Sequence, residues 1–285
     1  MGGEMMSQEI IKGTVPLVNF DSDSSVLPLW KGMTILKMNY KEFHDSYQVA
    51  FPSIELLNMK YVLELENIFS FMSDWVNLTH TKIEKPFGIE DSQYCQVKAG
   101  VFIANFIRTL RLYKNGSVFA PFILFKEIGT TFYMLDKAYG EIYLLKKSEV
   151  GELLNLHRRI VDPSFGTSNN VKLAMRRFST SYSEQECEDK IIDYFIAFES
   201  LFSVGNTRQK GNSVAIGASM LLGKDNAERA NIREDLERAY GVRNDIIHDS
   251  LSIEKSFKKR TICDEVVTFT SKVEDYLRDC IRKLG

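Results

Sequence analysis

Cysteine is scarce in this chain of 285 residues, and none of its four cysteines forms the C-x-x-C pair that is common in zinc sites. The four residues are Cys95, Cys187, Cys263 and Cys280. Because no histidine stands near them at zinc-ligand spacing, the sequence predicts neither a bound metal nor another cofactor. We expect free thiols, as in proteins of the reducing cytoplasm.

Long apolar runs are also lacking, and this absence bears on where the protein resides. The longest runs, such as residues 118–125, are far shorter than the roughly 20 residues that span a bilayer. Residues 1–11 show no basic start followed by an apolar stretch, the pattern of a secretory signal. The sequence therefore predicts a cytoplasmic protein with no membrane segment.

A strong charge of one sign is absent as well. The formal net charge is −2, with 44% apolar and 26% charged residues, as in ordinary soluble globular proteins. No global positive field attracts nucleic acid to this chain. Any contact with RNA or DNA must therefore depend on a local basic patch.

The first half of the chain mixes patterns of strands and helices. Short apolar-rich stretches at 14–20 and 34–40 predict strands, and the Asp, Ser and Pro residues between them predict turns. Residues 54–75 carry apolar side chains at helical spacing. Further along, residues 119–125 and 131–135 flank a glycine-containing turn and predict a hairpin, with another short strand at 142–145. No phosphate loop, metal cluster or nucleophile elbow occurs in this half.

The second half is predicted to be almost entirely helical. A connecting helix at 147–161 is ended by Asp162-Pro163, and a Ser/Gly/Asn-rich linker follows at 164–170. The further helices that we predict span residues 171–182, 186–204, 213–222, 226–248 and 255–283. The fold class is thus α+β. It has a mixed domain with an antiparallel sheet (1–145), a connecting helix and linker (146–170), and an all-α bundle (171–285).

One short motif in the predicted helix 226–248 carries chemistry. Arg243 and Asn244 are followed by His248 in the pattern R-N-x-x-x-H, and the chain has only four histidines. Imidazole titrates near neutrality and can transfer a proton. A guanidinium stays charged and can hold a phosphate through several N–H donors. These residue types suit cleavage of an RNA backbone without a metal.

A helical projection places two opposite charges on apolar faces. Arg243 falls near the centre of an arc that consists of Ile232, Leu236, Ala239, Tyr240, Ile246 and Ile247. Glu199 lies inside the apolar arc of the helix 186–204. Because a buried charge requires a partner, we predict an ion pair between Glu199 and Arg243. Such a pair can also merely fix helix register, and a histidine at a helix end such as His248 can merely cap carbonyls.

The motif presents a geometric difficulty. Arg243 and His248 are about 140° apart around an ideal helix, so their side chains point in different directions. They converge if the helix distorts, if the long arginine side chain wraps around it, or if a second subunit supplies the facing group.

The C-terminal part of the chain, from about Ala174 to Gly285, resembles the Apea-like branch of the HEPN superfamily (higher eukaryote and prokaryote nucleotide-binding domains). The resemblance depends on three ordered segments, A-M-R-R-F at 174–178, D-K-I-I-D-Y-F-I-A-F-E-S-L-F at 189–202 and A-Y-G-V-R-N-D-I-I-H at 239–248. The last segment matches the family signature of an arginine, a polar residue, three further residues and a histidine.

The resemblance implies a helical bundle that forms a homodimer with two such motifs facing one cleft. Active members of the family are metal-independent endoribonucleases, including toxins and anti-phage defence proteins. By this resemblance His248 acts as general base or acid, Arg243 steadies the phosphate, and Asn244 orients one of these groups, supported by Glu199. Basic residues that could guide RNA to the cleft are Arg208, Lys210, Lys255, Lys258, Lys259 and Arg260. A solvated surface is the other interpretation of these residues.

One residue departs from the family pattern. Asp249 stands where many relatives have glycine, and a carboxylate beside His248 favours the protonated imidazolium over the free base. Two hypotheses therefore remain. The first is a homodimeric ribonuclease whose N-terminal half senses a regulatory or phage-derived trigger. The alternative is a catalytically inactive HEPN module that serves as a scaffold or binds a nucleotide or protein partner.

Overall fold

The computed structural model describes residues 12–30, 32–47, 59–66, 91–125, 130–134, 137–203, 210–262 and 264–285. Contacts divide the chain into two compact units. The first, here called the sheet unit, comprises Met1–Thr109, Val118–Lys137 and Ile142–Asp162. The second, the helical unit, comprises Leu110–Ser117, Ala138–Glu141 and Pro163–Gly285.

The sheet unit contains a six-stranded sheet with the strand order β3-β4-β5-β1-β6-β7, in which all neighbouring strands run antiparallel. Its strands are β1 (Gly13–Val18), β3 (Val26–Trp30), β4 (Met33–Lys37), β5 (Met59–Leu65), β6 (Phe122–Phe125) and β7 (Thr130–Tyr133). Two further strands, β2 (Phe20–Ser22) and β8 (Tyr143–Leu145), pair in parallel. The antiparallel sheet and the predicted hairpin, seen here as β6 and β7, are confirmed.

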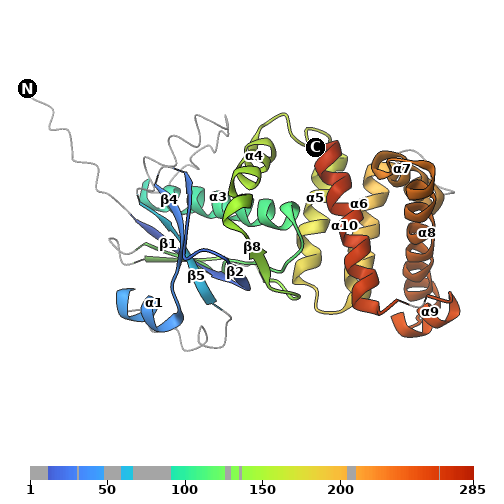
Figure 1. Cartoon of the computed structure of the whole chain (residues 1–285), viewed down its shortest axis with the longest axis horizontal. Helices are drawn as coiled ribbons and strands as arrows, with labels where there is room; N and C mark the ends of the chain where they lie inside the picture. The colour runs from blue at the N-terminus through green and yellow to red at the C-terminus, as the bar shows by residue number, and fades with distance from the viewer. Residues whose placement is uncertain are drawn as a thin grey trace, which may run out of the picture. The chain divides into compact units, whose positions relative to one another are not determined.

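Helices α1 (Tyr40–Tyr47) and α3 (Asp91–Tyr113) cover opposite faces of this sheet (Figure 1). Phe43 of α1 packs against Val62 and Phe122 on one face. Helix α3 has no counterpart among the predicted elements. Its buried side chains at Ala99, Phe102, Ile103, Phe106, Ile107 and Leu110 recur at helical spacing, so the sequence carried an apolar stripe that the prediction missed.

Two predictions in the sheet unit are wrong. The predicted helix 54–75 contains strand β5, with the remainder outside the described residues except for Glu66. β5 lies inside the sheet with most of its residues buried, so its nearly continuous apolar run imitates a helix. The predicted turn between the first two strands contains strand β3, which tolerates Pro28 because β3 lies at the edge of the sheet.

The segment predicted to connect the two halves forms a short 3-10 turn, η2 (Lys147–Glu149), and helix α4 (Val150–Val161). Contacts place α4 in the sheet unit, where its buried side chains include Leu153, Leu156 and His157. The chain then turns through residues 163–168, and Ser168 caps the next helix by accepting a hydrogen bond from the backbone N–H of Asn170.

His157 is the most deeply buried histidine of the described residues, with 1% of its surface exposed. It lies among the rings of Trp30, Phe102 and Phe106. The Thr109 hydroxyl donates to the carbonyl of Asn105 and lies 2.8 Å from His157 Nδ1, so Nδ1–H must be the donor to this hydroxyl. Burial lowers the pKa of His157 to about 3.

This burial predicts that the protein loses stability in mild acid. The unfolded chain binds a proton on His157 near pH 6.5 and the folded chain does not. The contribution of neutral His157 is therefore complete above pH 6.5 and declines toward pH 3, by up to about 1.4 kcal/mol per pH unit. Urea unfolding of wild type and of H157Q between pH 7 and 5 measures it. A matched change at the exposed His44, H44Q, should keep the wild-type slope, and an equal slope in H157Q would contradict the prediction.

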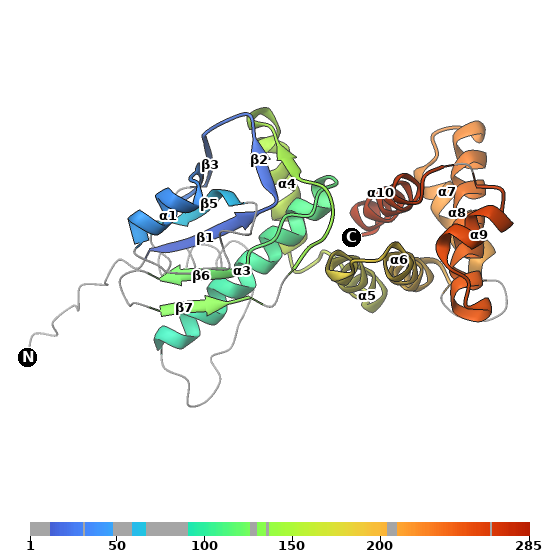
Figure 2. The same ribbon diagram turned by 90° about the horizontal axis from the view of Figure 1, so that it is seen from below.

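Within the helical unit, three helices pack together and two more pack against them. Helices α5 (Asn169–Thr180), α6 (Cys187–Phe202) and α10 (Val266–Leu284) form the first group (Figure 2). Helices α7 (Lys210–Leu222) and α8 (Asn226–Asp249) lie side by side against α6 (Figure 1). The all-helical character of this part is confirmed, and the turn η3 (Ser181–Ser183) follows α5.

The helix predicted over residues 255–283 is wrong, because two helices occupy this region. α9 (Ile253–Lys259) ends where Thr261 takes a left-handed backbone conformation (φ 56°), and α10 begins at Val266. The side chain of Arg260, at the end of α9, turns toward α8 and binds Asp245. The break thus allows α9 to pack against the end of α8.

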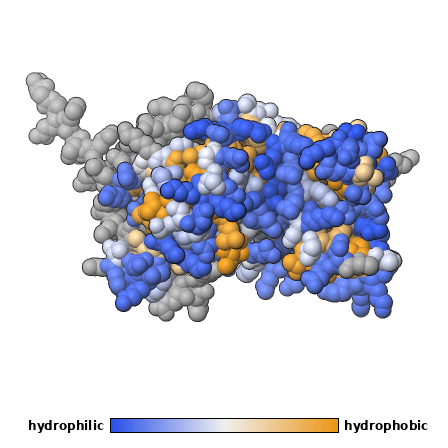
Figure 3. Space-filling model, in the orientation of Figure 1, coloured by the Kyte–Doolittle hydropathy of each residue, from blue (hydrophilic) through white to orange (hydrophobic). Residues whose placement is uncertain are grey.

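The surface gives no sign of a membrane-spanning segment. Within the described residues no helix is long and apolar enough to cross a bilayer. Hydrophilic residues cover most of the face drawn in Figure 3, and apolar residues occur there in small groups. Scattered exposed apolar side chains of this kind are ordinary in folded proteins.

Candidate functional site

The three residues of the R-N-x-x-x-H motif lie in the last two turns of α8. This helix begins at the cap residue Asp225, whose side chain accepts a hydrogen bond from the backbone N–H of Glu228. It ends at Ser250, which has a left-handed backbone conformation (φ 52°). The sequence therefore predicted the helix and its C-terminal limit to within one residue.

The guanidinium group of Arg243 binds two neighbouring side chains, those of Glu199 and Asn244. Its Nη2 lies 3.8 Å from Glu199 Oε1, and its Nη1 donates a hydrogen bond of 3.0 Å to Asn244 Oδ1. The guanidinium also lies 5.7 Å from the centre of the Tyr240 ring, within range of a cation–π contact. The predicted pair of Glu199 and Arg243 is confirmed. Both side chains are only partly buried, with 14% and 18% exposed respectively.

Glu199 has a second cationic partner, which the sequence did not assign to it. Lys210, at the first position of α7, donates from Nζ to Glu199 Oε2 at 2.9 Å. One carboxylate thus lies between two cations, and the three groups together carry a net charge of +1. Arg243 Nε is buried and makes no hydrogen bond to the residues that the structure describes, so one guanidinium donor is uncommitted.

His248 lies apart from this cluster. It is exposed near the end of α8, and its ring makes no hydrogen bond to any residue that the structure describes. Among the described residues no hydrogen bond joins Asn244 to His248, and the Asn244 amide oxygen accepts from Arg243. The structure therefore brings Arg243, Asn244 and Glu199 together within one chain and leaves the imidazole of His248 free in solvent.

Asp245, inside the motif, is a buried acid that sequence reasoning missed. It is 3% exposed, and its carboxylate binds Arg260 through two hydrogen bonds, of 2.6 Å from Nε to Oδ2 and 2.9 Å from Nη2 to Oδ1. Ser256 Oγ and Lys259 Nζ donate to the same carboxylate at 2.7 and 2.8 Å. The bonds from Arg260, and then those from Lys259 and Ser256, hold the pKa of Asp245 well below its usual range.

The apolar arc predicted for α8 is therefore wrong at its C-terminal end. Ile247, which the arc included, is 41% exposed, whereas Asp245 faces inward. Helix α9 packs on this side and provides a cation in place of an apolar surface. A sequence signal for this contact was present at Gly241, one turn before Asp245. A Cβ atom at Gly241 would lie 2.1 Å from Arg260 Nη1, so any larger residue here requires the guanidinium to shift.

Some of the basic residues proposed to guide RNA form ion pairs with carboxylates, and others form none with the described residues. Lys259 binds both Asp245 and Asp249, the latter at 2.9 Å, and Arg260 binds Asp245. The Asp249 carboxylate that follows His248 is thus paired with a lysine. Lys255 and Lys258 are exposed on α9 and have no ion-pair partner among the described residues. Arg208 lies outside the described residues.

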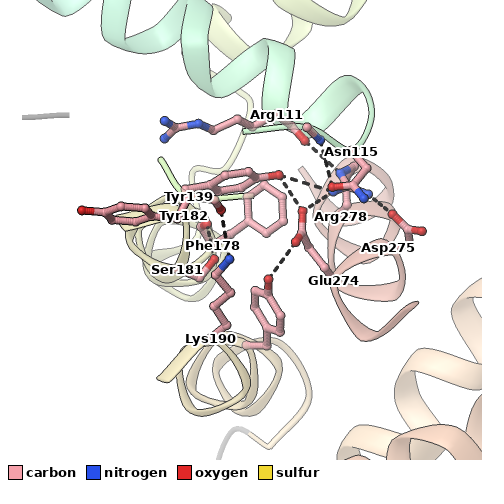
Figure 4. Close-up of polar contacts among 12 residues, drawn as sticks. Arg111, Asn115, Tyr139, Phe178, Ser181, Tyr182, Lys190, Glu274, Asp275 and Arg278 are labelled. Atoms are coloured by element: carbon pink, nitrogen blue, oxygen red, sulfur yellow. Dashed lines mark hydrogen bonds and ion pairs between the residues drawn. The ribbon is translucent and has the colours of Figure 1, made fainter. Parts of the chain in front are cut away.

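A second polar cluster lies within the helical unit, on the α10 side, and the sequence gave no indication of it (Figure 4). Glu274 of α10 accepts hydrogen bonds from the hydroxyls of Tyr182 and Tyr194, at 2.6 and 2.8 Å, and forms an ion pair with Arg278. Burial, followed by the nearby Glu274 charge, raises the pKa of Tyr194. The same Arg278 donates from Nε to the backbone carbonyl of Arg111 at 2.8 Å.

Within the described residues, no three histidine, cysteine, aspartate or glutamate side chains lie close enough together to hold a metal ion. Comparisons of the chain with protein-family models, with curated proteins and with solved structures found no match.

Proposed function

We propose that the helical unit is a metal-independent endoribonuclease of the HEPN type, whose site forms between two copies of the chain. One observation carries this proposal. The Arg243 guanidinium is fixed by Glu199 and Asn244, while His248, five residues later on the same helix, presents a free imidazole to solvent. An anchored phosphate-binding cation and an accessible proton carrier are the two groups that metal-free RNA cleavage requires.

The residues have the following roles in this proposal. His248 removes the proton from a ribose 2′-hydroxyl, and the resulting oxygen attacks the adjacent phosphorus. The bond from phosphorus to the 5′ oxygen of the next nucleotide breaks, and this oxygen takes up a proton from a protonated imidazole. Arg243 stabilises the negative charge that develops on the phosphate oxygens. The products are a 2′,3′-cyclic phosphate and a 5′-hydroxyl, so protons and electrons balance without a cofactor.

Two copies are required because one copy keeps the groups apart. Arg243 and His248 are about 140° apart around α8, and no hydrogen bond or ion pair of the described residues joins them. A second α8 that faces the first through a two-fold axis can place the His248 of one copy beside the Arg243 of the other.

The rest of the chain has supporting roles. Lys255 and Lys258 of α9 are exposed and unpaired among the described residues, so they can contact RNA phosphates. The separately packed sheet unit receives the signal that activates the enzyme, as expected for a toxin or anti-phage protein.

Purified protein incubated with single-stranded RNA in excess EDTA tests the chemistry. We expect cleavage that leaves 2′,3′-cyclic phosphate and 5′-hydroxyl ends, because no step requires a metal. Mass spectrometry of the fragments identifies the ends. Cleavage that leaves 5′-phosphate ends, or intact RNA together with failure of the protein to slow cell growth on overexpression, would contradict the proposal in favour of a binding or scaffold module.

A mixing experiment tests the shared site. R243A and H248A should each be inactive alone, yet mixed and re-equilibrated dimers should regain about a quarter of wild-type activity, because about half of them carry one intact site of two. A site within one copy predicts no recovery, since neither chain then holds both residues. Absence of recovery despite measured subunit exchange would overturn the shared site and leave the ribonuclease proposal standing.

A further inference from the structure

A small polar cavity lies in the helical unit, between the start of α6, the turn η3 and the middle of α10 (Figure 4). The lining residues that decide its chemistry are Ser117, Tyr139, Ser181, Lys190, Thr270 and Glu274. Its volume is about 70 Å³. Because one water needs about 10–15 Å³ of such space, the cavity has room for about five nonhydrogen atoms. This size excludes a nucleotide and suits a very small molecule.

The negative end of the cavity is Glu274, which is 8% exposed. Its Oε1 is fully engaged, because it accepts from the Tyr182 hydroxyl and from Arg278. Its Oε2 accepts one hydrogen bond, from the Tyr194 hydroxyl at 2.8 Å. A carboxylate oxygen can accept two, so Oε2 can receive one more N–H donor.

The hydroxyl groups that line the cavity also favour a ligand that carries hydrogen-bond donors. Ser181 Oγ donates to the carbonyl of Phe178. Thr270 Oγ1 likewise donates to a backbone carbonyl, that of Val266. Each hydroxyl has one hydrogen, so what these side chains still offer is lone pairs. A ligand that satisfies lone pairs and a carboxylate together carries several N–H groups and a positive charge, as an ammonium does.

The positive end of the cavity is Lys190. Its Nζ donates to the backbone carbonyl of Tyr139 at 3.0 Å, as Figure 4 shows, and an ammonium has two further N–H donors. The carbonyl neutralises none of the lysine charge. An anionic group of the ligand, such as a carboxylate, can therefore bind here through charge-assisted hydrogen bonds.

We propose that this cavity binds a small zwitterion with one ammonium and one carboxylate group, of the size of glycine or alanine. The ammonium lies toward Glu274 Oε2 and the hydroxyl oxygens, and the carboxylate lies toward Lys190. The proposal concerns the helical unit alone and does not depend on ribonuclease activity.

Isothermal titration calorimetry on the full chain tests the proposal with four probes. Glycine and L-alanine should bind with saturable heat. Acetate and methylamine should bind at least about tenfold more weakly, because each satisfies one end of the cavity only. Equal affinity for glycine and for either half-molecule would overturn the assignment of a zwitterion, as would a wild-type chain that gives no saturable heat, which would mean a cavity that holds only water.

Two variants show whether the binding occurs in this cavity. K190M removes the positive end, and S271L fills the cavity from a partly exposed position on α10 while every residue of the buried Glu274 cluster is kept. Both should weaken glycine binding at least about tenfold while the circular dichroism spectrum stays unchanged. T268L, at an exposed position on the same helix outside the lining, should bind as wild type does. Glycine binding that persists in both K190M and S271L would place it elsewhere and overturn the proposal.

Discussion

Replacing His248 by alanine is expected to slow RNA cleavage by about 10²–10⁴-fold, the range that one proton-transferring side chain contributes. In the proposed reaction no other group of the motif can accept the proton of the 2′-hydroxyl. Arg243 stays protonated, Asn244 does not titrate, and the buried Asp245 carboxylate is bound by Arg260, Ser256 and Lys259. His248 makes no hydrogen bond to the described residues and its side chain is exposed, so its removal should leave the fold intact. The measurement is the single-turnover cleavage rate of a labelled RNA in EDTA at fixed salt.

The chain provides a matched control for this prediction. His44 is another exposed histidine, located on α1 in the sheet unit, and among the described residues its one ion-pair partner is its neighbour Asp45. H44A removes the same chemical group from a position outside the proposed site, and it should cleave at the wild-type rate. If H248A and H44A retained equal activity, the imidazole of His248 would have no role in the chemistry.

Replacing Asp245 by alanine is expected to lower the free energy of unfolding by about 3 kcal/mol, because it breaks a buried ion pair by removing one partner. The carboxylate accepts four hydrogen bonds, from Arg260, Ser256 and Lys259, and these join α9 to the end of α8. Alanine leaves the Arg260 guanidinium, which is largely covered by protein, without its counter-charge. Urea unfolding at pH 7 measures the loss as a shift of the midpoint.

Two other variants of α8 test whether the loss of stability is specific to the Asp245 cluster. Asp249, one turn later, is exposed and pairs only with Lys259 among the described residues, so D249A should shift the midpoint far less. G241A should reproduce part of the loss in D245A, because its added methyl group would displace Arg260. Equal midpoints for D245A and D249A would show that the Asp245 cluster contributes no more than a surface pair.

The pH dependence of the same cluster has a defined sign. The pKa of Asp245 is lowered in the folded chain, mainly by Arg260, so folding favours the ionised carboxylate. The resulting stability is complete above the pKa of a free aspartate and is lost as the pH falls below it. D245A should therefore lose less stability than wild type between pH 5 and pH 3.

Particular residues show which features of the fold and of the site the sequence alone predicts. The periodicity of α8 and its apolar positions Ile232, Leu236 and Ala239 are local properties, and they predicted the helix that carries the motif. Glu199 and Arg243 were predicted as partners because each lies on the apolar face of its own helix, where a charge requires a counter-charge. Both inferences depend only on the period of one helix.

Other features required the packing of distant segments. β5 was predicted as a helix because burial on both faces erases the alternation that identifies a strand. Asp245 was assigned no role from the sequence, because its partner Arg260 comes from α9, 15 positions later. The Glu274 cluster joins side chains up to 96 positions apart, and no local pattern marks such a contact.

By itself, the sequence determined the helical character of the C-terminal part, the antiparallel hairpin and the motif with its Glu199 partner, because periodicity and misplaced charge are local signals. Only the tertiary structure decided that Lys210 shares Glu199 with Arg243, that Asp245 and not Ile247 faces inward, and that Lys190 and Glu274 line one cavity. Those contacts depend on which helix faces pack together, and this is fixed by the burial of the whole core.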